Sequence, residues 1–217
     1  MNTILNGACV AISLALAACT TVPTEQFHTL RPLGASPPAV AQTPFAGKAL
    51  DWLAVGPVTV PAALDRAQWV VRRAENRVQV MEQQRWAQPL AAEVAESVAQ
   101  NLTLHTGLLA VADAGNIGTG VLRKPTLRVK LQVLRMDAML TETPGIDDQF
   151  VWTITCGESQ GPSSAAAARS GVFSASPLIE AGPVYARLAQ AHAKALADLS
   201  QVLAQALPNA MAQCTPR

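Results

Sequence analysis

Charged residues are scarce in this sequence, and those present are interspersed. Among 217 residues, 16 are Lys or Arg and 15 are Asp or Glu, which gives a formal net charge of +1. Proteins that bind nucleic acid carry a clustered basic face that neutralises phosphates, and the sequence contains no such cluster. We therefore expect no nucleic-acid partner. Half of the residues are apolar, enough for one ordinary core, so we expect a single domain.

Patterns typical of metal and nucleotide sites are also missing. The three histidines are far apart, and none has a Cys, His or carboxylate at ligand spacing. We expect no metal and no cofactor, with His28, His105 and His192 at the surface or partly buried. No glycine-rich loop is followed by Lys and Ser or Thr, so the chain does not carry that nucleotide-binding loop.

The apolar run near the N-terminus is too short for a transmembrane helix. It covers residues 8–16, whereas a helix needs about 20 residues to cross the hydrocarbon core. The run leads into Leu16-Ala17-Ala18-Cys19, which resembles a bacterial lipobox. The resemblance implies that residues 1–18 are a lipoprotein signal peptide. No Lys or Arg precedes the run, which favours the alternative of a secreted chain without lipid.

Lipidation would fall on Cys19, the first residue after the predicted cleavage site. A lipobox implies a thioether-linked lipid and N-acylation, for example by palmitate, and several acyl chains hold a protein durably on a bilayer. The residue after the cysteine is Thr20 and not aspartate, which resembles lipoproteins that are released to the outer membrane. We therefore expect a lipidated tether at 19–26, a folded domain at 27–207 and a flexible tail at 208–217.

Two segments in the first half of the domain have clear periodicity. Residues 69–71 and 78–81 are β-prone runs separated by polar residues, which predicts a hairpin. From Pro89, apolar residues recur every four positions, which predicts a helix with one buried stripe, formed by Leu90, Val94, Val98 and Leu102.

The remaining elements complete an α+β domain. Further strands are expected at 27–30, 50–60, 126–136, 150–156 and 167–174, and a last helix begins at Pro183 and ends before Pro208. We predict a mainly antiparallel sheet with two long helices packed on it. The four tryptophans are expected in or at the edge of the core. Cys156 and Cys214 could pair in an oxidising compartment, although their spacing leaves the pairing open.

Several short motifs occur in an order that resembles a known family. They are Leu-Asp-Arg-x-Gln at 64–68, Val-Val-Arg at 70–72, Arg-Trp-Ala-Gln-Pro-Leu at 85–90 and Asn-Leu at 101–102. This set is similar to the PqiC/YmbA family of ABC-type transport auxiliary lipoproteins. Ala67 stands where the family usually has proline, and Gln88 where it usually has glutamate, so no role is expected of a carboxylate at position 88.

The resemblance implies a non-enzymatic accessory subunit of an envelope transport system. Its partners would be an MCE-domain protein and an inner-membrane permease, and the cargo would be lipids or other hydrophobic molecules. The protein would sit on the periplasmic face of the outer membrane, support membrane integrity and possess the capacity to form homo-oligomers. The partner-binding candidates are Asp65, Arg66, Arg72, Arg85 and Trp86, because Arg and Trp are enriched among residues that dominate interfaces. The alternative is that Asp65, Arg66 and Arg85 form an ion pair that fixes the hairpin to the helix.

One enzymatic alternative arises from the pattern Gly-x-Ser-x-Gly at 157–161. Ser159, Glu180 and His192 follow in the order of an α/β-hydrolase triad, which would make the chain an envelope serine esterase. The flanking segments are predicted strands of a hairpin, whereas that nucleophile requires a strand, a tight turn and a helix. Gly and Ser are also common turn residues, so the turn interpretation is preferred.

Overall fold

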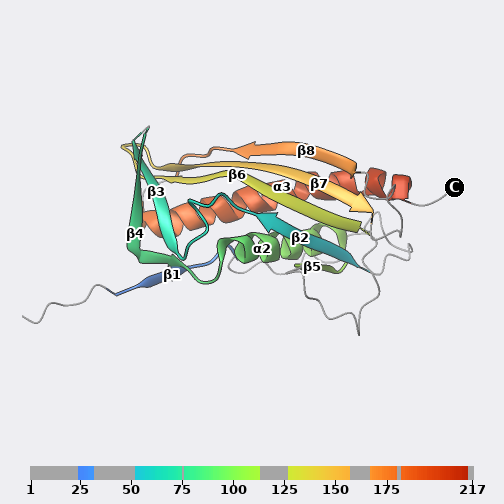
Figure 1. Cartoon of the computed structure of the whole chain (residues 1–217), viewed down its shortest axis with the longest axis horizontal. Coiled ribbons are helices and arrows are strands. Elements are labelled where there is room, and N and C mark those ends of the chain that lie inside the picture. Colours follow the sequence, from blue (N-terminus) through green and yellow to red (C-terminus); the bar gives the residue numbers. More distant parts are fainter. Residues whose placement is uncertain are drawn as a thin grey trace, which may run out of the picture.

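The computed structural model describes residues 24–31, 52–74, 76–112, 127–156, 167–179 and 182–214. Eight strands and two helices follow one another along these residues (Figure 1): β1 Gln26–His28, β2 Leu53–Thr59, β3 Gln68–Ala74, β4 Arg77–Trp86, α2 Leu90–Thr106, β5 Ala110–Ala112, β6 Leu127–Met139, β7 Gly145–Cys156, β8 Ala167–Ala175 and α3 Val184–Cys214. The predicted signal peptide and the tether as far as residue 23 lie outside them. Neither helix in this part of the chain is long and apolar enough to cross a membrane.

All eight strands belong to one sheet, which is mixed. The path runs β1-β4-β3-β6-β2-β5, with β7 paired to the other side of β6 and β8 paired to β7. Three pairings are antiparallel, β3 with β4, β6 with β7 and β7 with β8, and four are parallel. The prediction of a mainly antiparallel sheet is therefore wrong. Every antiparallel pair joins chain neighbours, whereas the parallel pairs join strands separated by other elements.

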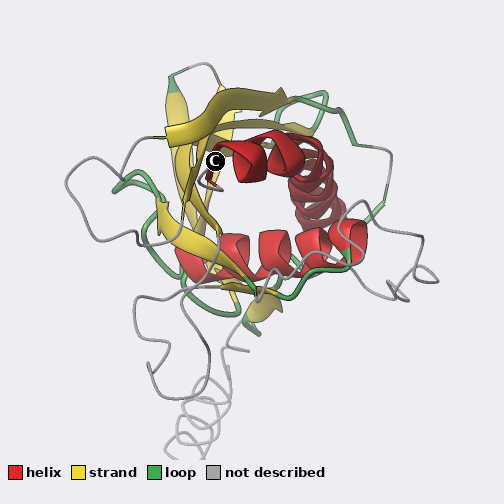
Figure 2. Cartoon of the chain, turned by 90° about the vertical axis from the view of Figure 1, so that its right-hand side faces the viewer, coloured by secondary structure: helices red, strands yellow, loops and turns green. Residues whose placement is uncertain are grey.

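The helices cover one side of the curved sheet (Figure 2). Helix α3 packs against β7 and β8, α2 packs against β2 and β5, and the two helices pack against each other. Strand β6 alternates as expected, with Leu127, Val129, Leu131 and Val133 buried and Lys130 and Gln132 exposed. Burial on one side of each strand and one face of each helix gives the single core.

Helix α2 follows its predicted pattern closely. Pro89 immediately precedes it, and the stripe Leu90, Val94, Val98 and Leu102 is at most 2% exposed. The helix ends at Thr106, and the capping residue Gly107 has a φ of 70°, the left-handed conformation that glycine adopts without a steric cost. The assignment of this stripe to the core is confirmed, as is the burial of Trp52, Trp69, Trp86 and Trp152.

Helix α3 is longer than the sequence predicted. It continues through Pro208 to Cys214, so the predicted end before Pro208 is wrong and 208–214 are not a frayed tail. Proline removes one helical hydrogen bond, but Leu207 and Ala210 beside it are buried and keep this turn against the core. The bond between Cys214 and Cys156 then holds the last turn to β7.

The segment after β1 is attached to α2 by two buried side chains. The backbone N–H of Leu30 donates to Glu93 Oε2 at 3.0 Å, and its carbonyl oxygen accepts from Ser97 Oγ at 3.3 Å. Thr29 Oγ1 also donates to Glu93 Oε2, at 3.0 Å. Because Leu30 is fully buried and Glu93 is 1% exposed, these bonds fix the position of β1 at the edge of the sheet.

Replacing Glu93 by alanine is expected to detach this segment. Hydrogen bonds to a charged group contribute about 1.5–3 kcal/mol, so the Leu30 amide should exchange with solvent about ten- to a hundredfold faster. Hydrogen–deuterium exchange of the peptide that contains 27–31 measures this. The control is Glu96→Ala on the same helix, which removes a partly exposed ion pair with Arg31 and a side-chain hydrogen bond with Gln88 but leaves the bonds of Leu30 in place. Equal protection of Leu30 in both variants would contradict the assignment.

Candidate functional site

The structure brings four of the five predicted partner-binding residues together. Asp65 and Arg66 are exposed in the turn before β3, and Arg85 and Trp86 end β4. The backbone N–H of Trp86 donates to the carbonyl oxygen of Ala67 at 2.8 Å, which places the turn beside the end of β4. Arg72 lies further along the hairpin, opposite Val78.

Arg85 is held by an acid that sequence analysis did not select. Its Nη2 lies 3.1 Å from Glu25 Oε1, and its Nε donates to the Glu82 carbonyl oxygen at 3.4 Å. The parallel pairing of β1 with β4 sets Phe27 opposite Arg85 and brings Glu25 within reach. Among the described residues Arg85 pairs with Glu25 and not with Asp65, so the alternative in which Asp65, Arg66 and Arg85 form the ion pair is wrong. Asp65 and Arg66 are exposed and directly precede Ala67, whose carbonyl oxygen accepts from the backbone N–H of the residue after Arg85.

Arg72 and Trp86 make their contacts inside the domain. Arg72 Nε and Nη2 lie 3.0 and 2.6 Å from Asp137 Oδ2, an ion pair that joins β3 to β6 where these strands run parallel. Trp86 is 8% exposed and stacks on Trp69 with ring centroids 4.4 Å apart. The solvent-facing part of the predicted surface is thus Asp65, Arg66 and Arg85. We call these three residues the hairpin-base surface.

A buried acid–base pair lies under this surface. His192 Nδ1 of α3 is 2.9 Å from Asp148 Oδ1 of β7, and the two side chains are 1% and 0% exposed. Burial raises the pKa of the Asp148 carboxyl, while the charge and hydrogen bond of His192 act in the opposite direction. Trp69 and Trp86 present their rings to His192 at centroid distances of 6.2 and 6.4 Å.

Sequence reasoning missed this pair and expected His192 at the surface or partly buried, which is wrong. A signal was present. Asp148 has the same alternation phase as the buried Phe150 and Trp152, and His192 falls on the α3 face of Leu188 and Leu199. An ionisable side chain on the buried face of a strand or helix needs a polar partner. Asp148 and His192 are each other's partner.

Two members of the proposed serine triad, Ser159 and Glu180, lie outside the described residues. The third, His192, contacts a different acid, Asp148. In the described residues, no group of three His, Cys, Asp or Glu side chains is arranged to hold a metal ion.

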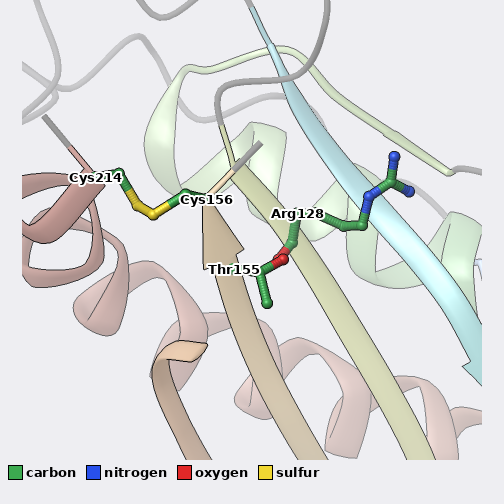
Figure 3. The surroundings of a disulfide bond; sticks show 4 residues. All are labelled: Arg128, Thr155, Cys156 and Cys214. Atoms are coloured by element: carbon green, nitrogen blue, oxygen red, sulfur yellow. A yellow bond between two sulfur atoms is a disulfide. The ribbon is translucent and has the colours of Figure 1, made fainter. Parts of the chain in front are cut away.

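The two cysteines of the domain are bonded to each other (Figure 3). Cys156 is the last residue of β7 and Cys214 the last of α3, with an S–S distance of 2.06 Å and a Cα–Cα distance of 5.4 Å. Beside them, Thr155 Oγ1 lies 3.5 Å from the Arg128 carbonyl oxygen on β6. The disulfide therefore joins α3 to the C-terminal end of β7, whereas Asp148 and His192 lie near the other end of that strand.

Comparisons with known proteins give the family. A crystal structure of protein XCC0632 from Xanthomonas campestris has 16% sequence identity and a TM-score of 0.61, covering 87% of this chain and 97% of that one. A crystal structure of an uncharacterized protein has 14% identity and the same TM-score, covering 85% and 99%. These likenesses show the fold. Comparison with curated proteins gave no match. The family profile described as "ABC-type transport auxiliary lipoprotein component" matches residues 33–204, and the chain therefore belongs to that family of envelope lipoproteins, as its sequence motifs suggested.

Proposed function

We propose that this lipoprotein is an accessory subunit that docks an MCE-type protein close to the outer membrane. Acyl chains on Cys19 would hold the domain on the periplasmic face, and the partner, with an inner-membrane permease, would carry lipids or other hydrophobic molecules between the membranes. The docking role is a binding role, and it requires no catalytic group on this chain. Family membership supports the transport assignment.

The observation that carries the docking site is its position relative to the tether. Glu25 pairs with Arg85, so the chain leaves the domain beside the hairpin-base surface. Residues 19–25 span at most roughly 23 Å when extended, which keeps this surface near the bilayer. A partner bound to this surface would have its end close to the outer membrane, where the cargo has to enter or leave the bilayer.

The chemistry of the surface fits a protein contact. Asp65 and Arg66 are exposed. Arg85 is followed by Trp86, the last residue of β4, whose ring stacks on that of Trp69. Interfaces are dominated by a few such anchors on rigid supports. The hydrogen bond from Trp86 N–H to the Ala67 carbonyl oxygen supplies this rigidity, since it joins the exposed turn to β4.

The proposal is tested by capture of the MCE-type protein of the same cell. The double variant Asp65→Ala with Arg85→Ala should recover at least about tenfold less partner, since loss of interface anchors costs 2 kcal/mol or more. The matched control is Arg73→Ala with Glu82→Ala, which also removes one arginine and one acid, here from the strands of the hairpin. Equal recovery by the wild type and the Asp65/Arg85 variant would remove the site assignment.

A further inference from the structure

A groove runs between the β1 segment and the first half of α3. It has a volume of about 440 Å³, within the range of about 300–1,000 Å³ that is typical of small-molecule sites. On the helix side it is lined mainly by alanines, at positions 186, 189, 193 and 197. On the other side stands Phe27, whose side chain is 62% exposed.

The shape of this lining suits a long, thin apolar group. Alanine side chains end at Cβ, so a ligand can approach the backbone of α3 along several turns. Positions 186, 193 and 197 recur at helical spacing on one side of α3. Phe27 gains little from its present surroundings and would bury apolar area if the groove were filled.

The charged side chains that line the groove have one sign. Its lining contains the cationic Arg31 and Lys194 and no Asp or Glu. The acids that pair with them, Glu96 and Asp198, do not line the groove. Ion pairs between exposed side chains contribute only about 0–1 kcal/mol, so an anionic ligand can compete for both cations. The groove is therefore complementary to an apolar chain with a negatively charged head.

The position of the groove near the lipid anchor indicates a source for such a ligand. Phe27 lies eight residues after Cys19, a span of at most roughly 28 Å. We propose that the groove binds one acyl chain of an anionic phospholipid taken from the adjacent bilayer. This inference deepens the proposed function and rests on it for the placement of the domain at a membrane. It gives this subunit its own contact with the lipid cargo.

The test uses the full-length lipidated protein in nanodiscs. The bilayer contains phosphatidylcholine and a small fraction of phosphatidylglycerol with a photoreactive diazirine in one acyl chain. After illumination and digestion, mass spectrometry should find adducts on Phe27 and on the alanine face of 186–197. Ala193→Trp fills the groove and should lower these adducts at least about tenfold, because excluding two methylenes already changes affinity by about that factor. Gln205→Trp, an exposed position about two turns beyond Ala197 on the same helix, is the matched control.

A second pair of variants tests the head group. Arg31→Gln with Lys194→Gln should remove the preference for diazirine phosphatidylglycerol over diazirine phosphatidylcholine. Both side chains lie in exposed ion pairs, so the fold should be retained, and circular dichroism checks this for every variant. Ala197→Leu, a smaller obstruction, replaces Ala193→Trp if that variant unfolds.

The outcomes separate this inference from the docking function. Adducts confined to residues before β1, or unchanged in the groove-filling variant, would overturn the lipid site. Adducts on the groove together with a failure to capture the MCE-type protein would leave the lipid site standing and remove the docking function. Capture without groove adducts would do the reverse. Loss of adducts with retained capture in Ala193→Trp would support both.

Discussion

Replacement of His192 by leucine will lower the free energy of unfolding by about 3–5 kcal/mol, the range observed when one partner of a buried ion pair is removed. Asp148 would remain fully buried with its carboxylate unpaired, since His192 is its partner at 2.9 Å and both side chains are at most 1% exposed. Burial already raises the pKa of the Asp148 carboxyl, and the variant would lose the His192 charge and hydrogen bond that oppose this shift. Urea unfolding followed by tryptophan fluorescence measures the change, because Trp69 and Trp86 lie beside His192.

The double variant Asp148→Val with His192→Leu is the decisive control. Replacing both members of a buried pair by apolar residues of similar volume is often neutral or stabilising, so most of the lost stability should return. This recovery would show that the single variant suffers from an unpaired charge rather than from a cavity. A loss below about 1 kcal/mol in His192→Leu, or no recovery in the double variant, would contradict the assignment.

The same pair shows what the sequence revealed and what it concealed. Periodicity predicted a strand at 150–156 and a helix from Pro183, and the structure contains both, although β7 begins at Gly145 and α3 continues to Cys214. Asp148 and His192 lie on the buried faces of these two elements. Their contact could not be predicted, since periodicity says which way a residue points and not which residue of another element it meets.

Strand pairing was also predictable only where it depends on local sequence. The hairpin β3–β4 and the antiparallel pairs of β6, β7 and β8 join neighbours in the chain, and polar residues between two β-prone runs indicate such pairs locally. The parallel pairs bring together strands that are far apart in sequence, such as β2 and β6, which are separated by the hairpin, α2 and β5. No local pattern specifies which distant strands will be neighbours, so the mixed sheet was predicted as mainly antiparallel.

The candidate site depended on the same distinction. The motifs around the hairpin directed attention to Asp65, Arg66 and Arg85, and the structure places them on one surface. The ion-pair partners of Arg85 and Arg72 are Glu25 and Asp137, one before β1 and one on β6. Both acids are brought to their arginines by parallel pairings, of β1 with β4 and of β3 with β6, and they were missed for that reason.

Removal of the disulfide, by Cys156→Ala with Cys214→Ala, is expected to cost about 4 kcal/mol. The bond joins residues 58 positions apart, and the loop-closure entropy that it removes from the unfolded chain corresponds to about that value. A second effect is local. Pro208 weakens the last turns of α3, and without the bond nothing covalent holds them to β7. Residues 208–214 should therefore lose hydrogen-exchange protection before the rest of the helix does.

Denaturant unfolding of the oxidised wild type and the cysteine-free variant measures the global term. Reductant should lower the stability of the wild type toward that of the variant and leave the variant unchanged, which separates the bond from the loss of two sulfur atoms in packing. A difference below about 1 kcal/mol, or an equal response of both proteins to reductant, would contradict a stabilising disulfide. If exchange at 208–214 stayed as slow in the variant as in the wild type, the buried face around Leu207 and Ala210 alone would hold the helix end, and Pro208 would lie in a turn that packing stabilises without the bond.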